Sequence, residues 1–163
     1  MKRLSTIIPL VILLSLALGC QKYGEEVAEE PVMNIEADME AIKSLFAHNS
    51  SVINSGNLDG WIAQFTEDAI FMPPNSVILK GKAAGREFAR PWYEQLNMDF
   101  EISVDEIEVN GNWAFARWSY VGRYTPKVGG DTTQKNGKEI WILRRQSDDS
   151  WKCSHIIYNF DSA

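Results

Sequence analysis

The sequence predicts an α+β domain in which the helices come first and an antiparallel sheet follows. Before residue 98, apolar residues recur at helical spacing in three segments, whereas from residue 99 onward they alternate with polar ones. Short turn sequences, above all Asn110-Gly111, separate the alternating segments. Consecutive strands are therefore expected to pair as hairpins.

The first two helices are predicted over residues 35–55 and 58–65. Asn34 and Asn57 precede them and are suitable N-caps, because their side chains can accept a hydrogen bond from the first helical turn. Gly56 is a suitable residue just after the first helix ends.

Two short strands and a third helix are expected next. Residues 69–72 and 77–79 read as strands on either side of a Pro-rich turn, and residues 82–97 read as a helix. Pro91 lies inside this helix and lacks a backbone N–H, so it is expected to kink or divide it.

Four longer strands complete the predicted sheet. They cover residues 99–109, 112–125, 138–146 and 151–160, and the third of them follows a Gly-rich loop.

The two faces of these strands differ in composition, because alternate residues of a strand share a face. One set is largely aliphatic, with Arg117, His155 and Asn159 interleaved, and we expect it to face the helices and line a ligand pocket. The opposite set mixes aromatic with charged residues and is expected to meet a second copy of the chain. The predicted dimer contacts are Trp118, Tyr120, Trp141 and Tyr158. A β-bulge would exchange the two faces over part of a strand.

The N-terminus has the pattern of an export signal. Lys2 and Arg3 precede an apolar run that is too short to cross a bilayer comfortably. The following Ala17-Leu18-Gly19-Cys20 resembles the lipobox of bacterial lipoproteins, which implies cleavage before Cys20 and lipid on that cysteine. Gln21 then favours the outer membrane, facing the periplasm, in a cell that has one.

This reading divides the chain into three parts. Residues 1–19 are the predicted signal peptide, 20–34 a lipidated acidic tether, and 35–163 the folded domain. With Cys20 lipidated, Cys153 has no partner for an intrachain disulfide.

Composition limits the function classes. The net charge is −6, and the part after residue 19 is more acidic still because the segment before it carries only cations. Such a domain repels phosphate backbones, so we expect no nucleic-acid partner. The two histidines and the remaining cysteine lack metal-ligand spacing, and no dinucleotide or phosphate-binding motif is present. We therefore expect no metal and no cofactor.

Several weak motifs in a fixed order resemble a known family. They are Gly56-Asn57-Leu58-Asp59-Gly60-Trp61, Phe65-Thr66-Glu67-Asp68-Ala69, Gly81-Lys82, Gly111-Asn112-Trp113-Ala114, Trp141-Ile142-Leu143-Arg144-Arg145 and Trp151-Lys152. Together they resemble the SnoaL-like, or domain of unknown function 4440, group of the nuclear transport factor 2-like superfamily. The resemblance implies a cone, formed by a strongly curved antiparallel sheet wrapped around three helices and commonly dimeric through the sheet.

The superfamily holds enzymes as well as binding and assembly domains, so the fold alone does not decide the function. By resemblance to ketosteroid isomerase, its base would fall on Pro73, its tyrosine near Asn49 and its later acid near Trp141 or Ile142. None of these residues can perform those roles. The leading hypothesis is therefore an envelope lipoprotein that binds a small, mostly apolar ligand or acts as a dimeric assembly module.

The alternative is a SnoaL-like isomerase, cyclase or hydrolase acting on a small carbonyl compound. His155 would then be the base, with Arg117 or Asn159 polarising the carbonyl. The competing interpretations are a core histidine at residue 155, which is the more common case, and an ion pair or sheet-edge position for Arg117. The candidate ligand-binding residues are Arg117, His155, Asn159, Asn49, Trp61, Phe65, Phe71 and Trp92.

Overall fold

The computed structural model describes residues 34–161. The predicted signal peptide and the lipidated Cys20 lie outside these residues. In chain order the elements are α1 (Ile35–Asn54), α2 (Leu58–Ala63), β1 (Phe65–Met72), β2 (Leu79–Lys80), α3 (Lys82–Gln95), β3 (Leu96–Asn110), β4 (Trp113–Pro126), β5 (Thr133–Arg145) and β6 (Trp151–Phe160).

The helix starts are those that the sequence predicts. The side chain of Asn34 accepts a hydrogen bond from the N–H of Ala37 at 3.1 Å, and that of Asn57 accepts one from Gly60 at 2.8 Å. α2 ends earlier than expected, because the carbonyl of Gln64 accepts a hydrogen bond from the N–H of Cys153 at 2.8 Å. This contact draws the chain into β1. Pro91 lies within α3 without dividing it.

The sheet is mixed rather than antiparallel. Its strand order is β2-β1-β6-β5-β4-β3, and β1 runs parallel to β6 while every other neighbouring pair is antiparallel. The four long strands form the expected meander. β5 begins at Thr133, so the preceding loop is shorter than predicted.

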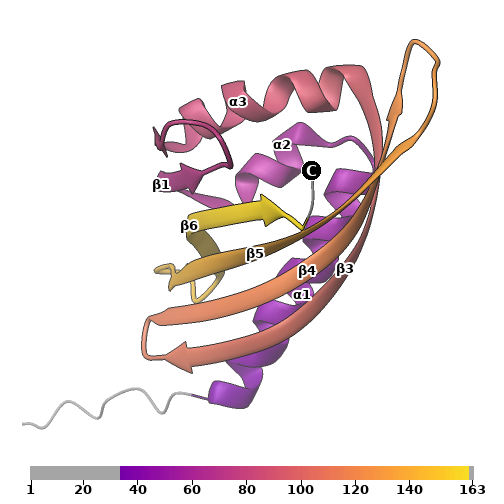
Figure 1. Ribbon diagram of the computed structural model, residues 1–163. Coiled ribbons are helices and arrows are strands. Elements are labelled where there is room, and N and C mark those ends of the chain that lie inside the picture. Colours follow the sequence, from indigo (N-terminus) through magenta and orange to yellow (C-terminus); the bar gives the residue numbers. More distant parts are fainter. Residues whose placement is uncertain (1–33, 162–163) are drawn as a thin grey trace, which may run out of the picture. The chain divides into compact units, whose positions relative to one another are not determined.

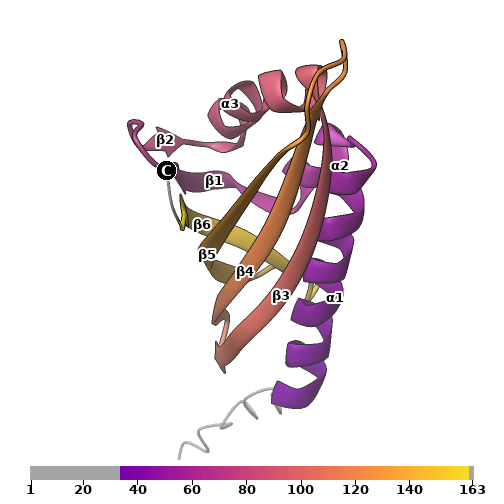
Figure 2. The same cartoon turned by 45° about the vertical axis from the view of Figure 1, so that its right-hand side comes forward.

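The sheet bends strongly around the helices, and all three helices lie on its concave side (Figures 1 and 2). α1 is tied to the edge strand β3 through Asn54, whose side chain accepts from the N–H of Phe100 at 2.7 Å and donates to its carbonyl at 3.2 Å. The opposite, outer face of the sheet is not covered by any of these helices (Figure 2). None of the helices in this part of the chain is both long and apolar enough to cross a membrane.

The predicted assignment of the two faces is wrong for most of the sheet. Trp118 is 1 % exposed, Tyr120 5 % and Trp141 0 %, so these predicted dimer contacts lie in the core. The rings of Trp118 and Trp141 pack on Phe46 of α1, with centroids 5.7 and 5.1 Å away. The interior of the cone is therefore aromatic, and the outer face carries the aliphatic residues.

Two bulges exchange the inward and outward faces partway along β3 and β6, whereas β4 and β5 pair in a regular register. Along the β3–β4 pairing the register shifts between Val104 and Glu106, and along β5–β6 it shifts after Ile142. Each shift inserts one residue, and the side chains beyond it change face relative to a regular alternation. Thus Cys153 is buried, whereas His155, two positions on, lies on the outer side beside Ile142.

Candidate functional site

A small cavity lies between the concave face of the sheet and the helices, with a volume of about 70 Å³. Its walls are mainly aromatic. The lining residues are Ile53, Trp61, Trp92, Tyr93, Met98, Phe100, Tyr120, Tyr124, Glu139 and Tyr158. Most are buried, whereas Trp61, Trp92, Glu139 and Tyr158 are partly exposed and connect the cavity with solvent.

Glycines on the inner face leave room for the rings. A Cβ atom at Gly137 of β5 would stand 2.5 Å from the ring of Tyr120, and one at Gly122 of β4 would meet Phe100 and Tyr124 at 3.1 Å. Phe100 and Tyr120 stack with their centroids 4.8 Å apart. In this wall, glycines therefore stand next to large aromatic residues and leave the space that their rings occupy.

Glu139 is the acid of this cavity. It occupies an inward position of β5 opposite Tyr158 of β6. The indole N–H of Trp141 donates to its Oε2 at 2.9 Å. Burial raises the pKa of Glu139 to about 8, although the hydrogen bond from Trp141 opposes this shift. The carboxyl group is therefore mostly protonated at neutral pH and can donate a hydrogen bond.

Two tyrosine hydroxyls extend this polar group. The hydroxyl of Tyr93 is buried and has no hydrogen-bond partner among residues 34–161, whereas the buried hydroxyl of Tyr124 lies next to the hydroxyl of Tyr120. Burial, and the nearby Glu139, hold the pKa of Tyr93 well above its usual range. Burial raises the pKa of Tyr124 to about 12, although a hydrogen bond with Tyr120 opposes this shift. Both phenols thus stay neutral, and the hydroxyl of Tyr93 has a donor to offer to a ligand.

The chemistry of the cavity follows from this set. Its lining residues include no Lys, Arg or His, so nothing in the wall would neutralise an anion. Among residues 34–161, no cluster of His, Cys, Asp and Glu could hold a metal ion. The cavity can bind apolar groups against its rings and an acceptor atom at its hydroxyl and carboxyl groups.

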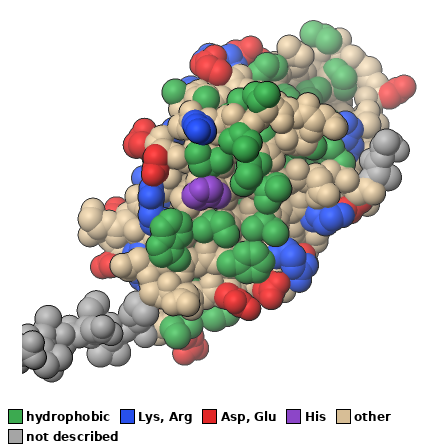
Figure 3. Space-filling view, turned by 60° about the vertical axis from the view of Figure 1, so that its left-hand side comes forward, with side chains coloured by type: hydrophobic (Ala, Val, Ile, Leu, Met, Phe, Trp, Pro, Cys, Tyr) green, Lys and Arg blue, Asp and Glu red, His purple; other side chains and the backbone are tan. Residues whose placement is uncertain are grey.

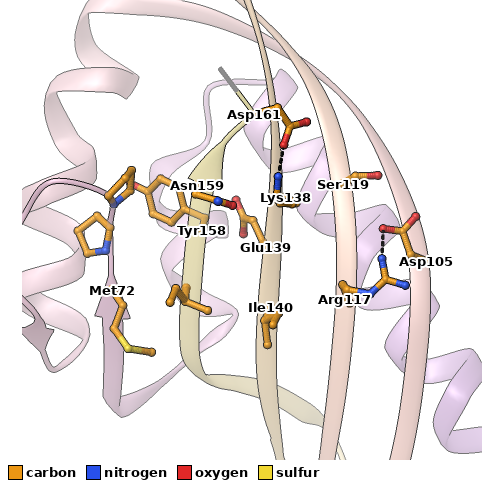
Figure 4. A pocket seen from close by; sticks show the side chains of 13 residues that line it. Met72, Asp105, Arg117, Ser119, Lys138, Glu139, Ile140, Tyr158, Asn159 and Asp161 are labelled. Carbon is orange, nitrogen blue, oxygen red and sulfur yellow. Dashed lines mark hydrogen bonds and ion pairs between the residues drawn. The ribbon is translucent and has the colours of Figure 1, made fainter. Parts of the chain in front are cut away.

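A second, larger concavity is an open groove with a volume of about 690 Å³, lined mainly from the outer face of the sheet, and it shares Glu139 and Tyr158 with the interior cavity (Figure 4). Met72, Ile140 and Ile157 supply its apolar floor, and charged pairs stand at its sides. Arg117 bonds to Asp105 at 3.1 Å and to Glu106 at 3.2 Å, and Lys138 pairs with Asp161. Its cations are therefore already neutralised.

The predicted site residues separate into three groups. Trp61 and Trp92 line the interior cavity, and so do Tyr120 and Tyr158, which were predicted to be dimer contacts. Phe65 and Phe71 are core residues beside Trp61, with centroids 4.8 and 6.2 Å away. Asn49 is buried and accepts a hydrogen bond from Gln64 at 3.2 Å, outside the cavity wall.

The polar residues predicted for the pocket lie on the other side of the sheet. Arg117 and Asn159 line the outer groove, and the Arg117 guanidinium is engaged by two acids. The Nδ1 atom of His155 lies 3.1 Å from the hydroxyl of Ser154. His155 is not among the lining residues of the cavity, so the assignment of His155 as its base is wrong.

Sequence reasoning missed Glu139, Tyr93 and Tyr124. A usable signal was present: Glu139 is an acid two positions before Trp141, and residues two apart on a strand share a face. Once Trp141 is recognised as buried, Glu139 becomes an inward-facing acid.

Comparison with known proteins identifies the class. Residues 45–151 match the SnoaL-like domain model, and the chain belongs to this family. Among curated proteins, none matches the chain.

Solved structures show the same fold. A ketosteroid isomerase-like protein from Erwinia carotovora atroseptica is 23 % identical, with a TM-score of 0.70 over 77 % of this chain and 98 % of that one. A nuclear transport factor 2-like superfamily protein from Salmonella enterica is 15 % identical, with a TM-score of 0.67 over 79 % and 94 %. A conserved protein from Planctomyces limnophilus is 18 % identical, with a TM-score of 0.71 over 77 % and 98 %.

Proposed function

We propose that this chain is a bacterial envelope lipoprotein whose cone domain binds a small, mostly apolar molecule in its interior cavity. The observation that carries the proposal is the set of unsatisfied polar groups in an aromatic wall. Within the described residues the buried hydroxyl of Tyr93 has no partner, and that of Tyr124 reaches only the hydroxyl of Tyr120. A buried polar group without a partner costs about 1–3 kcal/mol, and a bound ligand would recover part of that cost.

The lipoprotein part of the proposal rests on the sequence around Cys20. Lipid on that residue would anchor the domain to the membrane through two or more acyl chains. In a bacterium that processes lipoproteins, Cys20→Ala should abolish both the lipid mass and the membrane association of the chain. Mass spectrometry and membrane fractionation measure these two properties. An unmodified Cys20 in the mature chain would contradict this part.

Native mass spectrometry tests the ligand. The protein purified from its own host should retain a small molecule, which should be lost when Gly137→Ala fills the space now occupied by the Tyr120 ring. The added Cβ would stand 2.5 Å from that ring and push it toward the cavity. A matched change, Ser119→Ala in the outer groove, should leave the bound mass unchanged. Absence of any bound mass would favour a purely structural cone.

Catalysis on a small carbonyl compound is the second candidate, and the raised pKa of Glu139 is the observation that favours it. The reaction would belong to the isomerase, cyclase or hydrolase classes, and Glu139 replaces His155 as the acid or base. Enzyme incubated with metabolite extracts of the host should then consume a compound that the Glu139→Gln variant leaves intact.

The outer sheet face supports a homodimer. Figure 3 looks onto a face on which hydrophobic side chains gather around a histidine. Ile157 and Trp113, each 46 % exposed, carry large apolar groups that no described helix covers. Exposed apolar surface of this kind marks interaction sites. We infer that two copies meet through this face, rather than through the aromatic face that the sequence suggested.

A further inference from the structure

One row of side chains on the outer face of the sheet carries opposite charges at its two ends. Side chains directly opposite each other on neighbouring strands share a face. From β3 across to β2, the row consists of Glu108, Phe115, Ile142, His155, Ile70 and Lys80. Glu108 and Lys80 are exposed, and within residues 34–161 neither takes part in an ion pair. Between these ends the row is apolar except for His155.

This row is complementary to a second copy of itself. A twofold axis in the plane of the contact, crossing the row at right angles between Ile142 and His155, reverses the direction of the row in the other copy. Glu108 of one copy then lies opposite Lys80 of the other, and the apolar middles cover each other. The exposed Ile157 belongs to the next row of the same face. His155 of each copy is thereby enclosed in the contact.

We propose that His155 makes the homodimer dependent on pH: two copies associate while both imidazoles are neutral and separate when the rings take up protons. The inference rests on the proposed homodimer and adds its regulation. Imidazole is the side chain that changes charge between about pH 5 and 8. A charged ring enclosed by apolar groups loses its hydration without gaining a partner, which favours the separated copies.

The hydrogen bonds of His155 determine where the added proton is placed. The hydroxyl of Ser154 donates its only proton to the carbonyl of Ile142 at 3.0 Å. Its oxygen therefore accepts from Nδ1 of His155, which lies 3.1 Å away. In the neutral ring Nδ1 thus carries the hydrogen and Nε2 the free lone pair. The second proton binds to Nε2, on the side of the ring that is turned away from the buried Ser154.

The charged groups on the neighbouring strands do not offer His155 a free anion. Asp68 on β1 is engaged by Arg144 on β5, with Oδ2 3.2 Å from Nη1. The hydrogen bond from Arg144 lowers the pKa of Asp68 to about 2, so this carboxylate keeps its charge and its partner in weak acid. Lys152 on β6, opposite Arg144, and Lys80 on β2 are cations. Protonation of the ring therefore adds a positive charge beside other positive charges.

Glu139 also titrates near neutral pH, but with the opposite sign. It lines the outer groove, and burial raises its pKa to about 8. A second copy over the groove would oppose the ionisation of Glu139 further. Glu139 therefore weakens the dimer as the pH rises above about 8, whereas His155 weakens it as the pH falls. The direction of the response distinguishes the two groups.

The test follows dimerisation of the full chain in non-ionic detergent, with micelles in excess, by energy transfer between differently labelled copies. The dissociation constant should rise by roughly a hundredfold or more from about pH 8 to about pH 5, because each proton excluded from the dimer contributes up to about tenfold per pH unit. His155→Phe should give a dimer at both pH values, and His155→Lys a monomer at both. His48→Gln, on the exposed side of α1, should respond as the wild type does.

A charge exchange tests the alignment of the two rows. Lys80→Glu alone, or Glu108→Lys alone, would place like charges opposite each other and should weaken the dimer several-fold. Both substitutions together should restore the wild-type dissociation constant, because the charges are then opposite again. Both positions are exposed, so these variants should fold. A double variant that is as weak as the two single variants would overturn this alignment.

The outcomes separate this inference from the dimer on which it rests. A wild type that stays equally dimeric from about pH 8 to about pH 5 would overturn the role of His155 and leave the homodimer in place. Dissociation of the His155→Phe variant on acidification would do the same, because another group would then cause the response. A wild type that is monomeric at about pH 8 would remove the homodimer and its regulation together.

Discussion

Glu139 is an acid on the inner face of the cone whose ionised form would destabilise the fold and whose protonated form can donate a hydrogen bond. Ionising a carboxyl group on the inner face of the cone costs free energy, because burial removes the charge from water. The single hydrogen bond from Trp141 does not offset this desolvation cost. The fold therefore keeps it neutral. In that form it is a donor in a wall of rings, which makes it the most distinctive residue of the domain.

The same residue should make stability depend on pH. The folded chain holds a proton on Glu139 up to a pKa of about 8, whereas the unfolded chain releases it near 4.5. The folded state therefore binds more protons between these values, and the free energy of unfolding should fall as the pH rises through this window. Glu139→Gln should remove that decline, by up to about 1.4 kcal/mol per pH unit.

Urea denaturation at several pH values measures this effect. The matched control is Glu108→Gln, a change of an exposed acid that should retain the wild-type profile. Parallel profiles for Glu139→Gln and the wild type would show that Glu139 is ionised in the folded protein.

Sequence reasoning failed at the residues of the site because inward and outward positions could not be told apart. Both faces of β4 and β5 carry large side chains, so hydrophobicity does not rank them. Trp118 and Trp141 are buried against Phe46, a contact between segments far apart in the sequence. Arg117 was assigned to the pocket because the two faces of β4 were exchanged, and His155 because the bulge in β6 reverses the alternation after Cys153.

At the scale of elements, one buried cluster fixes the start of α1 to the ends of β5 and β6. Asp38 is buried, and its Oδ2 lies 2.5 Å from the guanidinium of Arg145. The indole N–H of Trp151 donates to Oδ1 at 3.3 Å, and the Arg145 guanidinium stacks on the Trp151 ring at 4.6 Å. The hydrogen bond from Arg145 holds the pKa of Asp38 below its usual range.

Asp38→Asn should therefore destabilise the domain by roughly 1–3 kcal/mol, because Arg145 loses its anion in a largely buried place. The comparison is Asp68→Asn, which removes an exposed pair with Arg144 and should cost less than about 1 kcal/mol. Thermal or urea denaturation measures the loss of stability caused by each of the two substitutions. An equal, small cost for both would mean that the Asp38 cluster adds little to stability. As the pH falls through the pKa of Asp38, wild type should approach the Asp38→Asn variant.

The elements themselves were largely predictable. Local features could be predicted directly, because they depend only on residues close together in the sequence. They are the N-caps at Asn34 and Asn57 and the turn at Asn110-Gly111. The bulges at Asp105 and Ser154 could not be predicted, because an extra residue in a strand cannot be recognised from the alternation of apolar and polar residues. These two residues set which side chains of β3 and β6 enter the cone.

At the scale of the whole molecule, the helices-first α+β order and the family resemblance predicted the fold and the meander of the four long strands, but not the pairing of β1 with β6. The parallel contact of β1 with β6 joins residues 85 to 88 positions apart in the sequence, and no local signal encodes it. That pairing carries Met72 onto the outer face beside Ile157. It extends the apolar surface on which the proposed dimer depends.

The dimer is tested by sedimentation of a chain that lacks residues 1–33, which leaves every described helix and strand intact. Wild type should sediment as a dimer. Ile157→Asp should give a folded monomer, because it places a charge in the centre of the apolar contact. Val128→Asp, at a position 98 % exposed in the β4–β5 loop, should remain dimeric. Trp118→Asp should unfold the domain rather than dissociate it, because Trp118 is a core residue. A monomeric wild type, or a dimeric Ile157→Asp variant with unchanged affinity, would remove the outer face as the interface.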